Sequence, residues 1–113
     1  MDIGNFIDRA KLPSQFVISE IKDHWINGIY KGYAFSAKVY SEPSEYGIKN
    51  GCVSKLQVLK KDIIPHKFGW GRKNTAYKVD RGDFDGPEQD HEIGEEIAGV
   101  IDKAISDKPL TND

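Results

Sequence analysis

Two aromatic and β-branched segments joined by only two residues constrain the fold most strongly. Residues 25–30 and 33–40 are rich in Trp, Tyr, Phe, Ile and Val, residue types that favour strands, and Lys31 and Gly32 separate them. A two-residue loop whose second residue is Gly predicts a tight β-hairpin, because Gly adopts the positive φ that such turns need. In the second segment, apolar residues alternate with more polar ones, which predicts a strand with one buried face.

Further strands are predicted on either side of this hairpin. Residues 52–60 and 75–79 alternate in the same way, and a short apolar run at 15–20 indicates an additional edge strand. Residues 5–12 are predicted to form a short helix that Pro13 stops. Residues 65–74 contain Gly69 and Gly71 among basic side chains and indicate an exposed loop.

The last predicted element is an amphipathic helix over residues 87–106. Its apolar stripe consists of Ile93, Ile97, Val100, Ile101, Ala104 and Ile105. Pro87 suits the first turn of such a helix. The expected fold class is therefore α+β, a mainly antiparallel sheet of about four strands with one C-terminal amphipathic helix packed on it.

The length of 113 residues corresponds to one domain. Residues 1–22 are expected to form an N-terminal helix or edge segment, 23–106 the α+β domain, and 107–113 a polar tail. A single cysteine, Cys52, excludes an internal disulfide and fits a reducing cytoplasm. The acidic N-terminal residues predict no secretory signal, and no segment reaches the roughly 20 apolar residues of a membrane helix.

Charge is distributed unevenly along the chain, although the net charge is only −2. From residue 49 to 78 the basic residues are Lys49, Lys55, Lys60, Lys61, Lys67, Arg72, Lys73 and Lys78, against Asp62 alone. From residue 80 to 96 the acidic residues are Asp80, Asp83, Asp85, Glu88, Asp90, Glu92, Glu95 and Glu96, against Arg81 alone. Such asymmetry can steer a charged partner, although like-signed clusters are more often solvated faces.

One stretch of the sequence is distinctive enough to indicate relatives. It comprises residues 37–48, Gly51 and residues 53–56, together with Trp25, Gly28 and residues 80–82. This pattern resembles a family of small uncharacterised proteins, a domain of unknown function found in phages, prophages and other mobile elements of Firmicutes. The resemblance covers residues 25–105, and it implies a genomic neighbourhood without implying any catalytic residue.

No enzymatic motif is present in the sequence. It contains no Gly-x-Ser-x-Gly elbow, no P-loop and no dinucleotide fingerprint. Cys52 with His24 or His66 is the only thiol–imidazole candidate. Glu42 and Glu45 flank a turn and could act as acid and base, but exposed carboxylates are common in loops. The sequence therefore predicts a protein that is not an enzyme.

Two patterns suggest a metal site, and both are incomplete. Aligned with a calcium loop, Asp83, Asp85 and Glu92 occupy ligand positions, but Arg81 stands where the first carboxylate belongs. His91 and Glu95, with Glu88 one turn earlier, share a helix face without a further ligand to complete the shell. We therefore expect neither a metal nor a cofactor.

The leading functional prediction is protein binding by a phage or prophage accessory protein. Acidic side chains on a rigid helix imitate nucleic-acid phosphates, and the resemblance to mobile-element proteins points to counter-defence of the anti-CRISPR kind. The expected partner is a host protein, such as a CRISPR effector or another defence component. The expected partner-binding residues are Glu42, Glu45, Tyr46, Asp83, Asp85, Glu88, Glu92, Glu95 and Glu96.

Two alternatives stay open. The first is a nucleic-acid or small anionic ligand-binding module, in which basic and aromatic side chains contact phosphates and bases. Its residues are Lys60, Lys61, Lys67, Trp70, Arg72 and Lys73. The second is a homodimer that pairs through an exposed strand edge.

Overall fold

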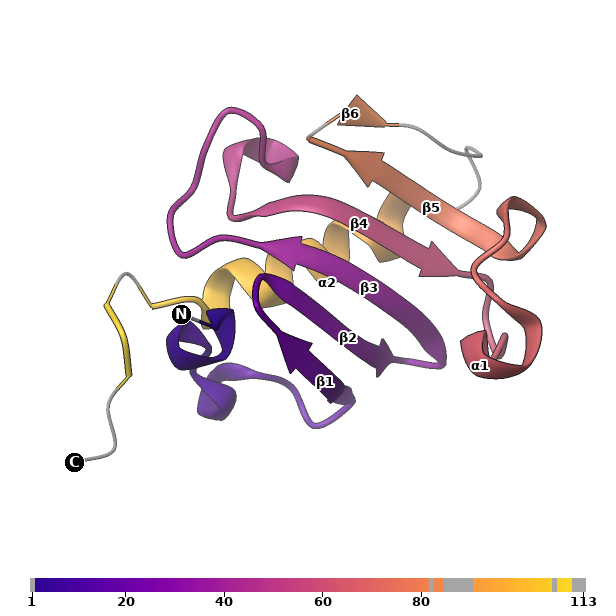
Figure 1. Ribbon diagram of the computed structural model, residues 1–113, viewed down its shortest axis with the longest axis horizontal. Coiled ribbons are helices and arrows are strands. Elements are labelled where there is room, and N and C mark those ends of the chain that lie inside the picture. Colours follow the sequence, from indigo (N-terminus) through magenta and orange to yellow (C-terminus); the bar gives the residue numbers. More distant parts are fainter. Residues whose placement is uncertain (1, 82, 85–90, 107, 111–113) are drawn as a thin grey trace.

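A computed structural model describes residues 2–81, 83–84, 91–106 and 108–110 of the chain. The described residues contain one six-stranded sheet in the order β1-β2-β3-β4-β5-β6, with each strand antiparallel to its neighbours (Figure 1). The strands are β1 (Phe16–Lys22), β2 (Trp25–Tyr30), β3 (Tyr33–Val39), β4 (Val53–Leu59), β5 (Thr75–Asp80) and β6 (Asp83–Phe84).

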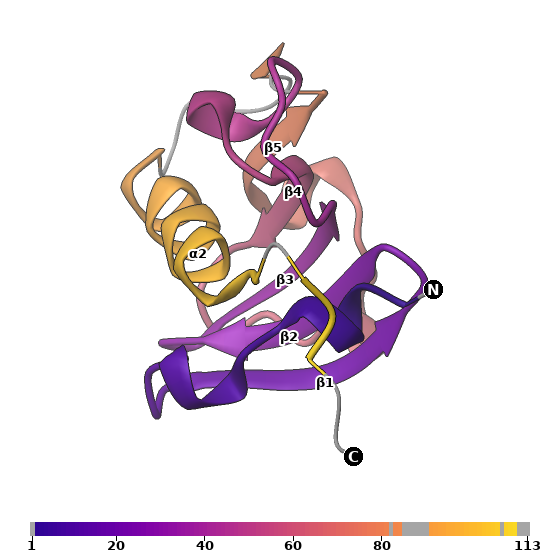
Figure 2. The same cartoon turned by 90° about the vertical axis from the view of Figure 1, so that its left-hand side faces the viewer.

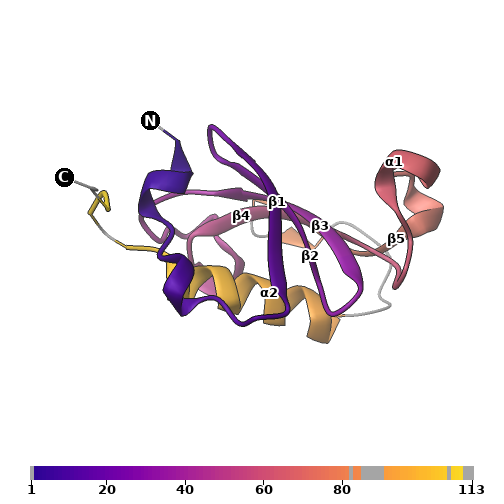
Figure 3. The ribbon, with the colours of Figure 1, turned by 90° about the horizontal axis from the view of Figure 1, so that it is seen from below.

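One face of the sheet is covered by the helix α2 (His91–Ala104), which lies behind the strands in Figure 1 and forms a second layer in Figure 2. Ile97 and Ile101 of the helix are buried against Ile26, Phe35 and Leu56 in one hydrophobic core. In Figure 3 the connection after β4 rises at one end of the opposite face, away from α2. It contains α1 (Pro65–Phe68) and the 3₁₀ helix η4 (Arg72–Asn74). The predicted α+β class with a C-terminal helix packed on an antiparallel sheet is therefore confirmed.

The predicted hairpin forms β2 and β3. Tyr30 and Tyr33 pair across the turn, and Lys31 and Gly32 both have positive φ values, 53° and 86°. This is the two-residue turn whose twist matches that of the flanking strands. The predicted face of β3 is also confirmed, because Phe35, Ala37 and Val39 are buried.

The strand count differs from the expected four, because the sheet has five strands of six or seven residues and a two-residue β6. The fifth long strand is β1, which confirms the edge strand expected at 15–20. Its pairing with β2 shifts register between Ile18 and Glu20, so Phe16, Ile18 and Ile21 do not follow a strict period of two. This bulge explains why the sequence signal of β1 is weak.

The helix predicted at residues 5–12 is wrong. The chain instead forms two 3₁₀ helices, η1 (Ile3–Phe6) and η2 (Arg9–Lys11), separated by extended backbone at Ile7. Ile7 forms an antiparallel bridge with Ile105, and the Ser106 N–H donates to the Phe6 carbonyl at 2.8 Å. This pairing holds the two terminal segments together and explains why α2 ends at Ala104, not at Ser106 as expected.

The predicted start of the C-terminal helix at Pro87 lies outside the described residues. The segment expected as an exposed loop at 65–74 contains two short helices, α1 and η4, although its basic side chains are exposed. No described helix is both long and apolar enough to span a bilayer.

Candidate functional site: the uncovered face of the sheet

We call the side of the sheet turned away from α2 the uncovered face. Strand alternation determines its composition, since the residues between the buried Ile26, Phe35 and Leu56 must point the other way. The register places two cross-strand rows on this face. The first is Lys22, Trp25, Lys38, Lys55 and Asp80, and the second is Glu20, Asn27, Ser36, Gln57 and Lys78.

The first row holds two like charges directly opposite each other. Lys38 on β3 and Lys55 on β4 are paired residues, an arrangement that destabilises a sheet. Asp80 offsets part of this repulsion, because its carboxylate lies 3.5 Å from the Lys55 ammonium, but the two side chains are 39% (Lys55) and 50% (Asp80) exposed, so the pair is weak. An unfavourable pair at the centre of a sheet marks this position as a candidate site for an anion.

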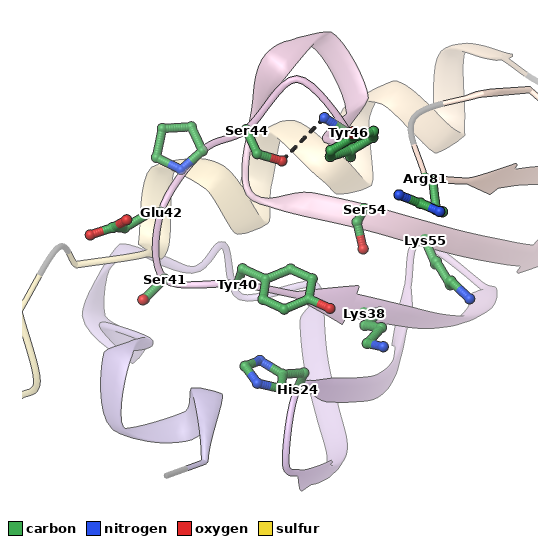
Figure 4. Close-up of a pocket in the computed structure, with 11 residues that line it drawn as sticks. His24, Lys38, Tyr40, Ser41, Glu42, Ser44, Tyr46, Ser54, Lys55 and Arg81 are labelled. Atoms are coloured by element: carbon green, nitrogen blue, oxygen red, sulfur yellow. Dashed lines mark hydrogen bonds between the residues drawn. The ribbon is translucent and has the colours of Figure 1, made fainter.

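A pocket of about 580 Å³ opens at this end of the uncovered face (Figure 4). We call it the basic pocket. It is lined by His24, Lys38, Tyr40, Ser41, Glu42, Pro43, Ser44, Tyr46, Ser54, Lys55 and Arg81. Three cationic side chains therefore face it against one carboxylate, and its volume lies within the range of small-molecule sites.

Aromatic contacts hold the side chains of the basic pocket. The guanidinium of Arg81 lies 4.7 Å from the centre of the Tyr46 ring, and the Lys38 ammonium lies 5.8 Å from that of Tyr40. The His24 ring lies against Tyr40 at 4.6 Å, and its Nδ1 is 3.0 Å from the Val39 carbonyl oxygen. Since a carbonyl only accepts, Nδ1 carries a proton in this contact.

The loop between β3 and β4 forms one wall of the pocket. It is closed by backbone hydrogen bonds from Tyr40 to the Cys52 carbonyl and from Ser44 to the Gly51 carbonyl. Ser44 Oγ also accepts from the Tyr46 N–H at 3.1 Å, a contact drawn in Figure 4. These bonds fix the loop that presents Glu42 and Tyr46 to the pocket.

A second hollow of about 340 Å³ lies beside the basic pocket. We call it the tryptophan groove, because Trp25 and Trp70 both line it, and Lys55 belongs to both cavities. Trp25 comes from β2 and Trp70 from the connection after β4, and their side chains are 39% and 37% exposed. Both tryptophans of the chain therefore lie at one groove on the uncovered face.

The acidic residues expected to bind a partner do not all lie free. Glu95 pairs with Lys49 at 2.7 Å and Glu96 with Lys31 at 2.8 Å. Hydrogen bonds from Lys31 and Tyr30 lower the pKa of Glu96. Glu92 is exposed on α2, and Asp83 is exposed on β6.

The remaining predicted partner-binding residues lie either in the β3–β4 loop or outside the described residues. Glu42, Glu45 and Tyr46 are exposed in the β3–β4 loop, and of these Glu42 and Tyr46 line the basic pocket. Asp85 and Glu88 lie outside the described residues, so the calcium pattern and the pattern built on the His91 side chain are not described either. Within the described part of the chain, no group of three His, Cys, Asp or Glu side chains is placed to hold a metal ion.

The basic candidates divide in a similar way. Trp70 joins the uncovered face, whereas Lys60, Lys61, Lys67, Arg72 and Lys73 are exposed around it on the connection and do not line the basic pocket or the tryptophan groove. Sequence reasoning missed Lys38, Lys55 and Arg81. Alternation placed Lys38 opposite the apolar face of its strand, but only the β3–β4 register brings it to Lys55.

The thiol–imidazole candidate has the wrong chemistry for a nucleophile. Cys52 is buried, and burial together with the nearby Asp102 carboxylate raises its pKa to about 11. A reactive thiol needs a lowered pKa instead. The Asp102 carboxylate lies next to Cys52 because it accepts a hydrogen bond from the Cys52 backbone N–H at 2.8 Å.

Comparison with known proteins identifies the family of the chain. A family model described as "Domain of unknown function (DUF7678)" matches residues 24–103, which include every residue that lines the basic pocket and the tryptophan groove. Searches of curated proteins and of solved structures find no match. The chain therefore belongs to the DUF7678 family of domains of unknown function.

Proposed function

We propose that this protein binds a phosphate-bearing small molecule in the basic pocket and performs no catalysis there. The observation that carries this proposal is the convergence of Lys38, Lys55 and Arg81 on one pocket of about 580 Å³. The first two are directly paired across the sheet, so their repulsion is relieved when an anion lies between them. A bound phosphate would therefore stabilise the fold as well as occupy the site.

The other lining residues fit a nucleoside monophosphate. Hydroxyl groups of Ser41, Ser44 and Ser54 supply further donors for phosphate oxygens, while Tyr40 and Tyr46 present aromatic rings to a planar base. Arg81, stacked on Tyr46, offers the fork geometry that suits a phosphate. The pocket thus combines cationic groups for an anion with aromatic rings next to them.

Calorimetric titration with adenosine monophosphate tests the proposal, with adenosine as the ligand that lacks the phosphate. We expect the nucleotide to bind at least tenfold more tightly than adenosine, because charge-assisted hydrogen bonds are the stronger ones. Lys55→Gln and Arg81→Gln should each weaken nucleotide binding about tenfold or more. Lys103→Gln, which removes an exposed lysine of α2, is the matched control and should change nothing. Equal binding of both ligands, or full affinity in both pocket variants, would refute the proposal.

We propose as a second candidate function that the β3–β4 loop binds a host protein. Glu42, Glu45 and Tyr46 are exposed together on the β3–β4 loop, and Tyr46 is 49% exposed, which is unusual for a large aromatic side chain. In this proposal the protein is a phage or prophage product that acts in the bacterial cytoplasm. The loop and the acidic residues Asp83 and Glu92 then contact a host defence protein, such as a CRISPR effector.

Charge reversal tests the second proposal. Glu42→Lys with Glu45→Lys should abolish capture of one host protein from a nuclease-treated lysate, because the complementary surface of the partner would then meet like charge. Glu20→Lys alters an exposed carboxylate outside this loop and should leave capture intact. A host protein that is captured equally by both variants would rule out the loop as its binding surface.

A further inference from the structure

We infer that the uncovered face binds single-stranded nucleic acid, with unpaired bases stacked on Trp25 and Trp70 and a phosphate of the strand in the basic pocket. This inference deepens the proposed function and rests on it, because the basic pocket would bind a phosphate of the strand. The shared phosphate chemistry can come from a free nucleotide or from a strand. The features beyond the basic pocket favour the strand.

The first feature is the pair of exposed tryptophans. A tryptophan side chain is normally highly buried, yet Trp25 and Trp70 keep more than a third of their surface exposed and flank one groove. Aromatic side chains that are presented on an open sheet or in a groove are the usual stacking platforms for unpaired bases. A mononucleotide in the basic pocket would leave both of them unused.

The second feature is that Trp70 is held in place by side chains of the sheet. Gln57 Nε2 donates to the Trp70 carbonyl at 2.9 Å and to Thr75 Oγ1 at 2.8 Å. Thr75 is 1% exposed, and its hydroxyl donates to the Gly71 carbonyl at 3.0 Å. This network ties the backbone of Trp70 and Gly71 to the sheet, so the segment that carries the Trp70 side chain has a defined position beside the tryptophan groove.

The third feature is the polar row that crosses the floor of the uncovered face. Asn27, Ser36, Gln57 and Lys78 lie side by side on β2, β3, β4 and β5. The Ser36 hydroxyl and the Lys78 ammonium can bind base edges and backbone phosphates, whereas Gln57 Nε2 donates within the protein to Trp70 and Thr75. Asn27 Oδ1 is buried and has no hydrogen-bond partner among the described residues.

The fourth feature is continuity. Lys55 belongs to both the basic pocket and the tryptophan groove, and Trp70 belongs to the groove and to a further hollow of about 640 Å³ that includes Ile29 and Ile64. The hollows therefore follow one another across the sheet. Such a row suits an extended strand better than a compact ligand, and stacking requires bases that are not already paired in a duplex.

Tryptophan fluorescence tests the inference directly, because the chain has only these two tryptophans. An oligothymidylate of about 12 nucleotides, within the site sizes of sheet-based single-strand binders, should quench the emission saturably. Trp25→Phe and Trp70→Phe each leave one reporter, and both variants should still be quenched. Trp25→Ala and Trp70→Ala should each weaken binding about tenfold, with circular dichroism confirming that the variants fold.

Salt and ligand controls distinguish stacking from simple charge attraction. Lys78 lines the tryptophan groove and not the basic pocket. In Lys78→Gln, the slope of the logarithm of the oligothymidylate affinity against the logarithm of the salt concentration should fall by about one, the loss of one phosphate contact. Polyphosphate has the charge without the bases and should not quench. Equal quenching by polyphosphate, or unchanged oligonucleotide affinity in folded Trp25→Ala and Trp70→Ala, would overturn the inference.

The same titrations separate this inference from the proposed function. Adenosine monophosphate binding that is lost in Arg81→Gln, without any oligothymidylate binding, would leave the pocket proposal standing and refute the strand. Oligothymidylate binding with quenching, but no monophosphate binding, would refute the pocket proposal and leave the stacking of bases on Trp25 and Trp70 standing.

Discussion

Two glycines of α2 offer a matched test of how the helix packs on the sheet. Gly94 faces the buried ring of Tyr77, and a methyl group at Gly94 would lie within 2.5 Å of three ring carbons. Gly99 lies on the same helix, and apart from its chain neighbours and the backbone of α2 itself, a methyl group there would have no atom within 4 Å. Alanine is favoured over glycine in a helix by about 1 kcal/mol, so both substitutions share the same intrinsic gain.

The packing terms of the two substitutions have opposite consequences. Overpacking costs about 1–3 kcal/mol, and the upper end applies to Gly94 because the overlap falls at the root of an immobile ring. Gly94→Ala should therefore lower the free energy of unfolding by about 2 kcal/mol, whereas Gly99→Ala should raise it by about 1 kcal/mol. At this chain length the melting temperatures should move by about 8 °C downward and about 4 °C upward. Thermal unfolding followed by circular dichroism measures both, and equal stabilisation by the two variants would refute the contact between Gly94 and Tyr77.

Two further predictions concern single contacts. In a Trp25→Phe background, Gln57→Leu should red-shift the Trp70 emission and raise its quenching by acrylamide, since the loop loses its anchor to the sheet; an unchanged spectrum would show that Gln57 does not position Trp70. Burial raises the pKa of Asp102 above its ordinary 3.8, against the opposing effect of the Cys52 N–H hydrogen bond, so the folded state holds this proton more tightly than the unfolded state. The contribution of Asp102 to the free energy of unfolding is therefore present below pH 3.8 and is lost as the pH rises through the folded pKa. Asp102→Asn keeps an acceptor for the Cys52 N–H and should remove this decline, measured as the urea midpoint at a series of pH values. An unaltered pH profile in Asp102→Asn would contradict the prediction.

Local chemistry accounts for the parts of the fold that the sequence predicts well. The turn at Lys31 and Gly32 and the buried stripe of α2 are each determined within one segment. The turn is confirmed, and so is the stripe at Ile93, Ile97 and Ile101, whereas Ile105 lies beyond the helix. The weak points are those where distant segments decide the conformation. Ile7 is extended and not helical because it pairs with Ile105, 98 residues further along the chain.

The candidate site was harder to predict because it depends on register. A long connection separates Lys38 from Lys55 in the sequence. Their pairing depends on the register between β3 and β4, which the residue pattern of neither strand predicts on its own. Likewise, Glu96 belongs to an acidic run in the sequence, yet it pairs with Lys31, which is 65 residues away. A run of like charges along the chain is therefore a poor guide to the charge of a surface once the strands have paired.

Backbone amide chemical shifts tell most directly whether the uncovered face is the binding surface. In a titration of the isotope-labelled protein with adenosine monophosphate, we expect the shift changes to cluster at His24, Tyr40, Tyr46, Lys55 and Arg81, with α2 unaffected. With oligothymidylate, the changes should extend to Trp25, Gln57 and Trp70. Changes confined to α2, or none with either ligand, would contradict the assignment of the uncovered face as the functional surface.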